Sequence, residues 1–429
     1  MKEKMKLTPL EKSWIFYDIG NSAFTLLVST LLPIYFNSLA SSAGISDSDY
    51  LAYWGYAGSI STLLVAFIGP VCGTLADGKG YKKPIFIASL VLGLVACCLM
   101  GTVSSWIAFL LVFIVAKVGY SSSLVFYDAM LPEITTEDRM DRVSSAGYAL
   151  GYIGSVIPFA VCLVVVLMPD LFGLTTSSGM MVAIFITAIW WTVMTVPLLK
   201  RYRQTAYAER KGNPITATFR QLGSTLKNVR KEKHIFLFLL AFFFFIDGVY
   251  TIIDMATAYG TALGLDTTGL LLALLVTQIV AFPFAILFGR LASKYNTGLL
   301  IKICILAYTG ITVFAIFLAS QWQFWTLAVM VGMFQGGIQA LSRSYLGKII
   351  PAERSGEFYG LMDIFGKGAS FVGMILVSLV SQFTAGITVN IFGLTLQNEN
   401  LAVGSLIILF IIGYSLFCKA DKLNQAKSA

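Results

Sequence analysis

Long apolar runs separated by short polar segments make up most of the chain. A helix that crosses a bilayer takes about 20 mostly apolar residues, and each run reaches or approaches that length. The pattern predicts twelve membrane-spanning helices and little mass outside the lipid. We place the helices near residues 14–39, 51–76, 84–103, 106–128, 145–168, 180–199, 235–262, 268–289, 298–319, 322–346, 357–382 and 401–418.

The composition supports a membrane protein and excludes several other classes. Of the 429 residues, 57% are hydrophobic and 12% are charged, whereas a soluble domain is usually about 45–50% apolar and about 25% charged. An ordinary soluble enzyme, a disordered protein and a nucleic-acid binder are therefore excluded. The fold class predicted is an all-α membrane protein. We expect the lipid bilayer and a small-molecule solute, and no nucleic acid, as its partners.

The placement of the basic residues predicts the topology, with both termini in the cytoplasm. The net charge is +8, and the middle segment 200–233 alone holds ten Lys or Arg and two Glu. Basic loops stay on the cytoplasmic side of a membrane. The loops expected outside hold no Lys or Arg; they lie near 40–50, 104–105, 169–179, 263–267, 320–321 and 383–400. We therefore expect a multi-pass protein of the plasma (inner) membrane.

The two halves of the chain echo each other. The cytoplasmic basic linker 200–233 divides the predicted spans six and six, which gives an N-terminal half at 1–199 and a C-terminal half at 234–429. Gly73 and Gly289 each begin a Gly-x-Leu-Ala turn, 216 positions apart, and Tyr127 and Tyr345 follow a similar offset. Two repeated six-helix halves are typical of transporters that bind substrate where the halves meet.

The first of these turns resembles the cytoplasmic loop motif of the major facilitator superfamily. The matching residues are Gly73, Leu75, Ala76, Asp77, Gly80, Lys82 and Lys83, whereas Gly78 and Tyr81 replace basic residues that the motif usually has. A glycine lets two helices approach closely, and an aspartate is stabilised at a helix N-terminus. The resemblance implies the twelve-helix major facilitator fold. We expect a conformational switch at Gly73, Asp77, Gly80, Lys82 and Lys83, with the two lysines keeping the turn in the cytosol.

A narrower resemblance covers nearly the whole chain. The segments 14–22, 335–345 and 357–367 resemble the vacuole effluxer, autophagy-related branch of that superfamily, also called the unknown major facilitator family. Gly20 stands where that branch usually has Ala, and Met362 where it often has Tyr. The resemblance implies a solute permease or effluxer. Its fungal members export amino acids from the vacuole, and this chain looks like a bacterial member, so amino acids are one expected class among small organic solutes.

Several polar and ionisable side chains fall inside predicted spans, where they are expensive and indicate a functional site. At 1.5 Å per residue, Lys117, Asp247 and Lys367 lie roughly 15–18 Å deep, near the midplane of a core about 30 Å thick. We expect the pathway for substrate or coupling ion to include Asp18, Asn21, Lys117, Asp247, Tyr250, Asp254, Gln335, Gln339 and Lys367, and a gate near the cytosolic rim to include Arg343 and Asp363.

Some of these residues also have a purely structural interpretation. Asp363 and Lys367 stand four positions apart and can pair on one helix. Asp18 and Asn21 can hold the start of the first helix. Arg343 can cap carbonyl groups at the cytosolic gate, as an alternative to direct contact with substrate.

Asp247 and Lys117 are harder to explain by structure alone, because neither has an obvious partner within its own helix. Substrate binding, proton coupling and a pairing between the two halves all remain open for them. A buried aspartate has a raised pKa and can carry a proton at cellular pH.

Three functional classes remain, and a secondary active transporter fits best. It would work by alternating access, with two halves rocking around a central site and with proton coupling as one option. A lipid or amphiphile flippase on the same fold is the alternative. A membrane-embedded enzyme or receptor lacks support, because the chain has one histidine and no cysteine–histidine spacing typical of a metal site. We expect no enzymatic activity, cofactor, metal or disulfide framework, and we expect a monomer.

Overall fold

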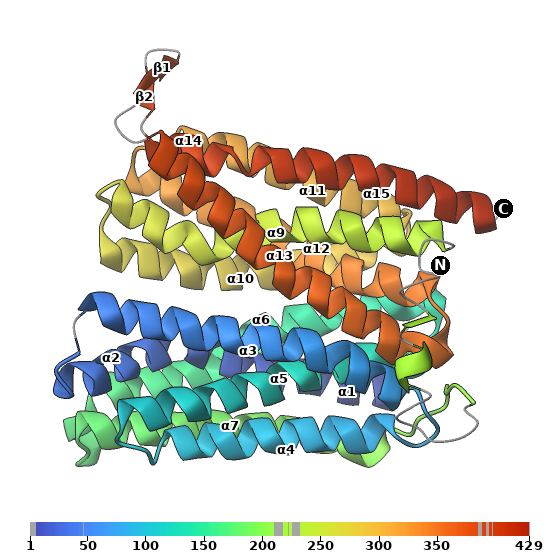
Figure 1. Ribbon diagram of the computed structural model, residues 1–429, viewed down its shortest axis with the longest axis horizontal. Coiled ribbons are helices and arrows are strands. Elements are labelled where there is room, and N and C mark those ends of the chain that lie inside the picture. The colour runs from blue at the N-terminus through green and yellow to red at the C-terminus, as the bar shows by residue number, and fades with distance from the viewer. Residues whose placement is uncertain are drawn as a thin grey trace. The chain divides into compact units, whose positions relative to one another are not determined.

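The structure is a computed structural model that describes residues 6–45, 47–209, 218–221, 223–224, 232–384, 388–391, 394–396 and 398–428 (Figure 1). The described residues are helical apart from turns and one two-stranded antiparallel hairpin, which pairs β1 (Val389–Ile391) with β2 (Leu394–Leu396). The hairpin lies in the outer loop near 383–400, for which the sequence predicted no element. The all-helical membrane fold is otherwise as the apolar runs predicted.

The first five long helices follow in chain order. A 34-residue span is built from α1 (Pro9–Leu26), a π-helical turn (Leu27–Leu31) and α2 (Leu32–Ser42). It begins earlier than expected, because Thr8 and Glu11 form a reciprocal capping box at the start of α1. The next helices are α3 (Asp47–Ala76), α4 (Lys82–Met100), α5 (Trp106–Ile134) and α6 (Glu137–Leu167).

The remaining helices complete the chain. A short 3₁₀ turn (Pro169–Phe172) leads to α7 (Thr176–Arg201), and α9 begins after the polar middle segment. The long helices that follow are α9 (Lys233–Ala262), α10 (Thr267–Leu291), α11 (Thr297–Ile316), α12 (Gln321–Ile349) and α13 (Ser355–Phe383). A 3₁₀ turn (Ala352–Arg354) precedes α13, and α14 (Asn398–Gly404) and α15 (Ile407–Ser428) end the chain.

Eleven spans among the described residues are long and apolar enough to cross a membrane. The expected span that is not among these eleven is the one at 357–382, which corresponds to α13. This helix has 29 residues, roughly 43 Å of length, which exceeds a hydrocarbon core of about 30 Å; its described apolar segment is Val372–Phe383.

The chain forms two compact units, and the first contains residues 1–136, 150–219 and 352–360. Within it α1 packs on α7, α3 packs on α5, and α4 packs on α5. Its core is rich in aromatic rings: Trp14 stacks on Tyr127 with ring centroids 4.3 Å apart, and the Trp14 indole N–H donates to the Tyr127 carbonyl oxygen at 3.0 Å.

The second unit contains residues 137–149, 220–351 and 361–429 and repeats the same helix pairings. In it α9 packs on α15, α10 packs on α12, and α11 packs on α12. Tyr345 again meets an aromatic side chain of the first helix of its unit, because its ring centroid lies 5.0 Å from that of Phe238. The internal repeat expected from the sequence is thus visible as a repeated packing pattern.

Two helices are divided between the units, and this division positions the candidate site. The start of α6 (137–149) belongs to the second unit, while the rest of α6 belongs to the first. The start of α13 (355–360) belongs to the first unit, while the rest of α13 belongs to the second. The half boundaries at 199 and 234 stay a prediction.

Candidate functional site

The turn after α3 holds the start of α13 through a carboxylate. Asp77 is wholly buried. Its Oδ1 accepts the Gly356 N–H at 2.7 Å and its Oδ2 accepts the Glu357 N–H at 2.9 Å. These N–H groups belong to the first turn of α13, where a helix has unsatisfied donors and favours an anion. The Asp77 carboxylate therefore caps a helix that is 279 positions away in the sequence.

The approach of α3 to α13 requires glycine on both sides. A Cβ atom added at Gly73 would overlap the Gly356 carbonyl oxygen, and one added at Gly356 would overlap the Gly73 carbonyl oxygen. Gly80 serves the turn itself, because its φ of 79° lies in the left-handed region that favours glycine. The glycines of the motif thus have a direct steric reason.

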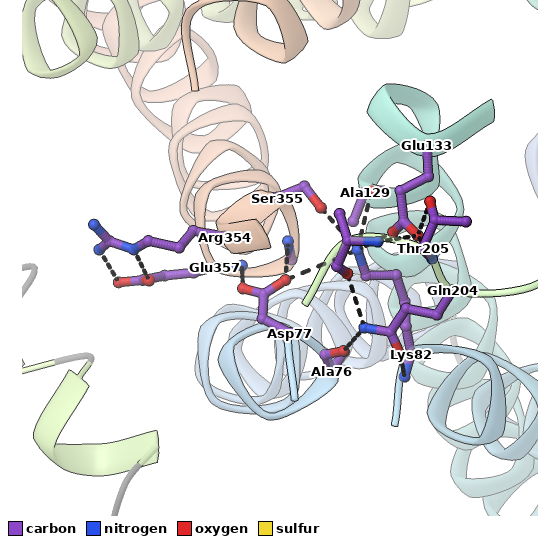
Figure 2. Close-up of polar contacts among 12 residues, drawn as sticks. Ala76, Asp77, Lys82, Ala129, Glu133, Gln204, Thr205, Arg354, Ser355 and Glu357 are labelled. Atoms are coloured by element: carbon purple, nitrogen blue, oxygen red, sulfur yellow. Dashed lines mark hydrogen bonds and ion pairs between the residues drawn. The ribbon is translucent and has the colours of Figure 1, made fainter. Parts of the chain in front are cut away.

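Lys82 is the centre of the first cluster, which comprises Asp77, Lys82, Glu133 and Ser355 (Figure 2). Its side chain is 0% exposed, and that of Glu133 is 1% exposed. The Lys82 ammonium lies 2.6 Å from Glu133 Oε1, 2.8 Å from Ser355 Oγ and 3.9 Å from Asp77 Oδ1. Lys82 is thus buried among three polar partners, and its expected role in keeping the turn in the cytosol stays a prediction.

Glu133 ties the segment that follows α7 into the same cluster. Its Oε2 accepts the backbone N–H groups of Thr205 and Ala206 at 2.6 and 3.2 Å, and its Oε1 accepts the Tyr202 hydroxyl at 3.1 Å. Burial, followed by the neighbouring Glu133 charge, raises the pKa of Tyr202 well above its ordinary value, so the hydroxyl stays a donor. Lys83 also reaches this segment and donates to the Tyr202 carbonyl oxygen at 3.2 Å.

Burial also raises the pKa of Asp77, to about 7, while the Lys82 charge and the two N–H donors of α13 act in the opposite direction. The carboxylate therefore titrates near cellular pH.

In the first turn of α13, Glu357 forms an ion pair with Arg354 through two hydrogen bonds, at 3.0 and 3.1 Å.

A second cluster, in the second unit, comprises Asp141, Thr297, Ser344 and Lys348. The buried Asp141 lies on the start of α6 and accepts from Thr297 Oγ1 at 2.7 Å and from Ser344 Oγ at 2.6 Å. The Lys348 ammonium forms an ion pair with Asp141 Oδ2 and donates to Thr297 Oγ1 at 2.9 Å. These contacts join α6 to the start of α11 and the end of α12.

The two clusters occupy matching places in the repeat. Lys82 begins α4 and Thr297 begins α11, 215 positions later. Glu133 lies near the end of α5 and Lys348 near the end of α12, again 215 positions later. In each cluster these two helices are joined to the start of a helix that is divided between the units. The charges are placed differently, because the ammonium comes from the third helix in one unit and from the fourth in the other, and the neutral Thr297 stands where the first cluster has Lys82.

Arg343 lies beside the second cluster. Its Nε and Nη2 donate to the hydroxyl and the carbonyl oxygen of Ser144, both at 2.9 Å, and its guanidinium lies 4.3 Å from the ring centroid of Tyr148. Both contacts are on the start of α6. The interpretation of Arg343 as a residue that binds carbonyl groups at the expected cytosolic rim agrees with this geometry.

Asp247 lies in the middle of α9 and is wholly buried. Its Oδ1 accepts the Gly373 N–H of α13 at 2.9 Å and the Thr251 hydroxyl at 3.3 Å, and its Oδ2 has no hydrogen-bond partner among the described residues. The expectation that its own helix offers it no partner is therefore wrong, since Thr251 is one turn away. A Cβ atom at Gly373 would overlap Thr251 and Asp247, so glycine is required where α13 passes this carboxylate.

The deep residues of the first unit form two separate groups. Lys117 on α5 is half-buried, with its ammonium 5.9 Å from the Phe113 ring centroid. Asp18 and Asn21 are buried on α1, with Asn21 Nδ2 at 3.5 Å from Asp18 Oδ1. They do not hold the start of the first helix, which begins nine positions earlier, at Pro9.

The other expected pathway residues belong to the second unit. Gln335 is buried on α12, Gln339 and Tyr250 are half-buried, and Asp254 is exposed. Asp363 is half-buried on α13. The Lys367 side chain lies outside the described residues, so its pairing with Asp363 stays a prediction.

Comparison with known proteins places the chain in a family. A family model described as "Vacuole effluxer Atg22 like" matches residues 10–421. The chain belongs to the vacuole effluxer Atg22-like family. It is a multi-pass membrane protein of the major facilitator superfamily of transporters, and this family is not one of enzymes.

Two relatives illustrate the breadth of the Atg22-like family. The "Uncharacterized MFS-type transporter YxiO" of Bacillus subtilis (strain 168) is 40% identical over 413 residues, which cover 95% of this chain and 94% of YxiO. "Autophagy-related protein 22-1" of Aspergillus niger is 26% identical over 265 residues, which cover 56% of this chain and 42% of the fungal protein. This chain thus matches less than half of the fungal protein's length.

Solved structures show the major facilitator fold. FucP, a major facilitator transporter in its outward conformation, superposes with a TM-score of 0.70 at 13% identity, covering 96% of this chain and 97% of FucP. The human organic anion transporter MFSD10 superposes with a TM-score of 0.68 at 12% identity, covering 95% and 98%. At these identities the likeness shows the fold alone.

Sequence reasoning missed several members of the two clusters: Glu133, Asp141, Thr297, Lys348 and Ser355. Each is an ordinary polar residue at the end of a helix, where solvent exposure is the default expectation. The signal that was available is the repeat, because Glu133 and Lys348 stand 215 positions apart, within one position of the offset between the two Gly-x-Leu-Ala turns.

Proposed function

We propose that this Atg22-like protein is a secondary active transporter of a small organic solute and works by alternating access. The observation that carries the proposal is the pair of equivalent buried clusters. A purely structural ion pair does not need to recur at the same place in both units. A gate that closes both repeats at one end needs such a cluster in each unit.

Each cluster has the chemistry of a reversible latch. It contains buried charges and charge-assisted hydrogen bonds that connect three helices. A buried ion pair contributes little net stability, because desolvation offsets the attraction, but breaking it by removal of one partner is costly. We propose that the clusters hold the cytosolic ends of α6 and α13 in one state of the transport cycle and release them in the other.

The proposed topology has both termini in the cytoplasm and the protein in the cell membrane, and the absence of Lys and Arg from the loops expected outside supports it. A cysteine introduced at the exposed Thr205 should be protected from an impermeant thiol reagent in intact cells, and one at the exposed Leu171 should react. Peptide mass spectrometry separates both sites from the six native cysteines. The opposite labelling pattern would invert the topology and remove the latches from the cytosol.

The proposed substrate class rests on the resemblance to fungal effluxers and on the polar residues in the spans, and amino acids are the first solutes to test. We propose that transport is coupled to protons through Asp247. Right-side-out and inverted vesicles with and without the protein are loaded with a defined mixture of amino acids and other small metabolites. Retained solutes are then measured by mass spectrometry.

At least one solute should cross faster when the protein is present, and a protonophore should abolish its accumulation against a gradient. Asp170→Asn, which changes an exposed acid in the outer turn after α6, is the matched control and should behave as the parent. If no solute moves in either orientation, the proposal fails. If a fluorescent phospholipid crosses instead, the flippase alternative replaces it.

A further inference from the structure

The second unit contains an apolar cavity of about 420 Å³ that the transport proposal does not use. It lies between α9, α13 and the α14–α15 region, toward the end expected to face outside. Its walls include Ile252, Met255, Leu327, Val377, Val403 and Leu406. Cavities that hold small organic ligands have volumes of roughly 300–1,000 Å³ and mostly apolar walls with a few polar groups. This cavity is in that range.

One carboxylate opens into this apolar space. Glu399, in the first turn of α14, lines the cavity, and its Oε2 is buried with no hydrogen-bond partner among the described residues. The nearby phenol is already satisfied, because the Tyr259 hydroxyl donates to the Ala315 carbonyl oxygen at 2.7 Å and accepts from Asn400 Nδ2 at 2.9 Å. A buried, unpartnered carboxylate oxygen is costly, so its presence requires a physical reason.

No cation among the described residues compensates Glu399. The described stretches that contain the cavity's lining residues, 235–265, 303–342, 372–384 and 398–418, hold no Lys or Arg. No ion pair within the described part of the chain includes Glu399. Among the described residues the carboxylate of Glu399 thus has no compensating positive charge, which a bound ligand could supply.

We propose that this cavity binds an amphipathic organic amine, with the ammonium at Glu399 and the hydrocarbon part against the apolar walls. The ammonium supplies the donor and the charge that Glu399 lacks. The walls are mostly apolar, and an apolar surrounding of low dielectric strengthens the attraction between the two charges. Thr251 lines the same cavity and donates to Asp247, so a bound amine lies one side chain away from the deep carboxylate of α9.

The experiment is equilibrium binding of radiolabelled phenylbutylamine to the purified full-length protein in nanodiscs, with empty nanodiscs subtracted. At about pH 7.5 a primary amine carries a proton, as a lysine side chain does. Unlabelled phenylbutylamine should displace the label, and phenylbutanol, which has nearly the same shape and no charge, should be a much weaker competitor. Because binding is measured without transport, a failure here leaves the transport proposal intact, and the reverse also holds.

Three variants sharpen the test. Glu399→Gln should weaken amine binding roughly thirtyfold or more, as expected for loss of one partner of a buried charge pair, and should leave binding of the alcohol unchanged. Val403→Trp fills the cavity and should abolish binding of both compounds. Glu353→Gln, an exposed acid in the 3₁₀ turn before α13, is the matched control and should bind as the parent. Size-exclusion profiles establish that each variant is folded.

Two results would overturn the proposal. The first is equal affinity of the parent for the amine and the alcohol, which would make the site a general apolar cavity. The second is full amine binding by folded Glu399→Gln or Val403→Trp, which would place the amine elsewhere. The comparison of amine with alcohol uses the parent alone, so the proposal remains testable even where a variant does not fold.

Discussion

Replacement of Lys82 by methionine tests the first cluster most directly. Methionine keeps the length and the apolar character of the side chain and removes the ammonium. In the structure that ammonium contacts Glu133, Ser355 and the Ala129 carbonyl oxygen at 2.6, 2.8 and 3.4 Å, and the side chain has no exposed surface. The substitution therefore leaves the Glu133 carboxylate buried without a cation and the Ser355 hydroxyl without its partner.

The expected magnitude follows from what Glu133 retains. Loss of one partner of a buried ion pair costs roughly 3–5 kcal/mol. Glu133 keeps donors from Tyr202, Thr205 and Ala206, so we expect the lower limit, about 3 kcal/mol. Since each 1.4 kcal/mol is a factor of ten, local opening at the start of α13 should become roughly 100-fold more frequent.

The assay is amide hydrogen exchange in nanodiscs, together with thermal unfolding followed by fluorescence-detected gel filtration. In Lys82→Met, peptides that cover the start of α13 and the segment after α7 should exchange faster, and the melting temperature should fall. The double variant Lys82→Met/Glu133→Gln should regain most of the loss, because Glu133 no longer leaves a buried carboxylate without its cation and Asp77 keeps the two N–H donors of α13. Lys200→Met, an exposed lysine near the end of α7, is the matched control.

Two outcomes would refute the reasoning about this cluster. One is a Lys82→Met variant that exchanges and melts like Lys200→Met, which would mean that the buried contacts do not hold α13. The other is a double variant that is less stable than Lys82→Met. Each loss would then be independent, and the ion pair would not be the unit that matters.

Four further predictions follow from the same geometry. Because burial raises the pKa of Asp77 from 3.8 to about 7, the folded protein binds this proton more tightly than the unfolded chain does. The stabilisation from this proton should be fully present below pH 3.8 and lost as the pH rises through 7. The melting temperature should show this dependence, and Asp77→Asn should remove it. Gly73→Ala should push α13 away from α3 and raise exchange at the start of α13, and unchanged exchange would contradict the steric argument. Asp141→Asn should lower the melting temperature by leaving the half-buried Lys348 facing an amide, and a melting temperature equal to that of the parent would dismiss the second cluster as a latch. Asp247→Asn keeps an acceptor for α13, so with an identified substrate it should retain exchange and lose gradient-driven accumulation; intact accumulation would exclude Asp247 as the proton carrier.

The sequence alone determined the class, the spans and the family of this protein. Membrane insertion depends on the summed hydropathy of about 20 consecutive residues, which is a local quantity that requires no knowledge of packing. The same holds for the turn with Gly73 and Asp77, because its spacing is confined to a few positions. The sequence also predicted that Asp77 can face the N-terminus of a helix, but it did not show that this helix is α13.

Only the tertiary structure decided which polar residues meet. Lys82 and Ser355 are 273 positions apart, and nothing in the local sequence of either predicts that the other satisfies it. Helix ends are ordinarily exposed, so the local sequence around Glu133, Asp141 and Lys348 did not show that the fold places Glu133 in one cluster and the other two in another. Asp247 shows the same limit, because the backbone N–H that it accepts belongs to a glycine 126 positions away. Hydrophobic patterning selects which segments enter the membrane, whereas the pairing of the few polar groups among them is set by how the helices pack.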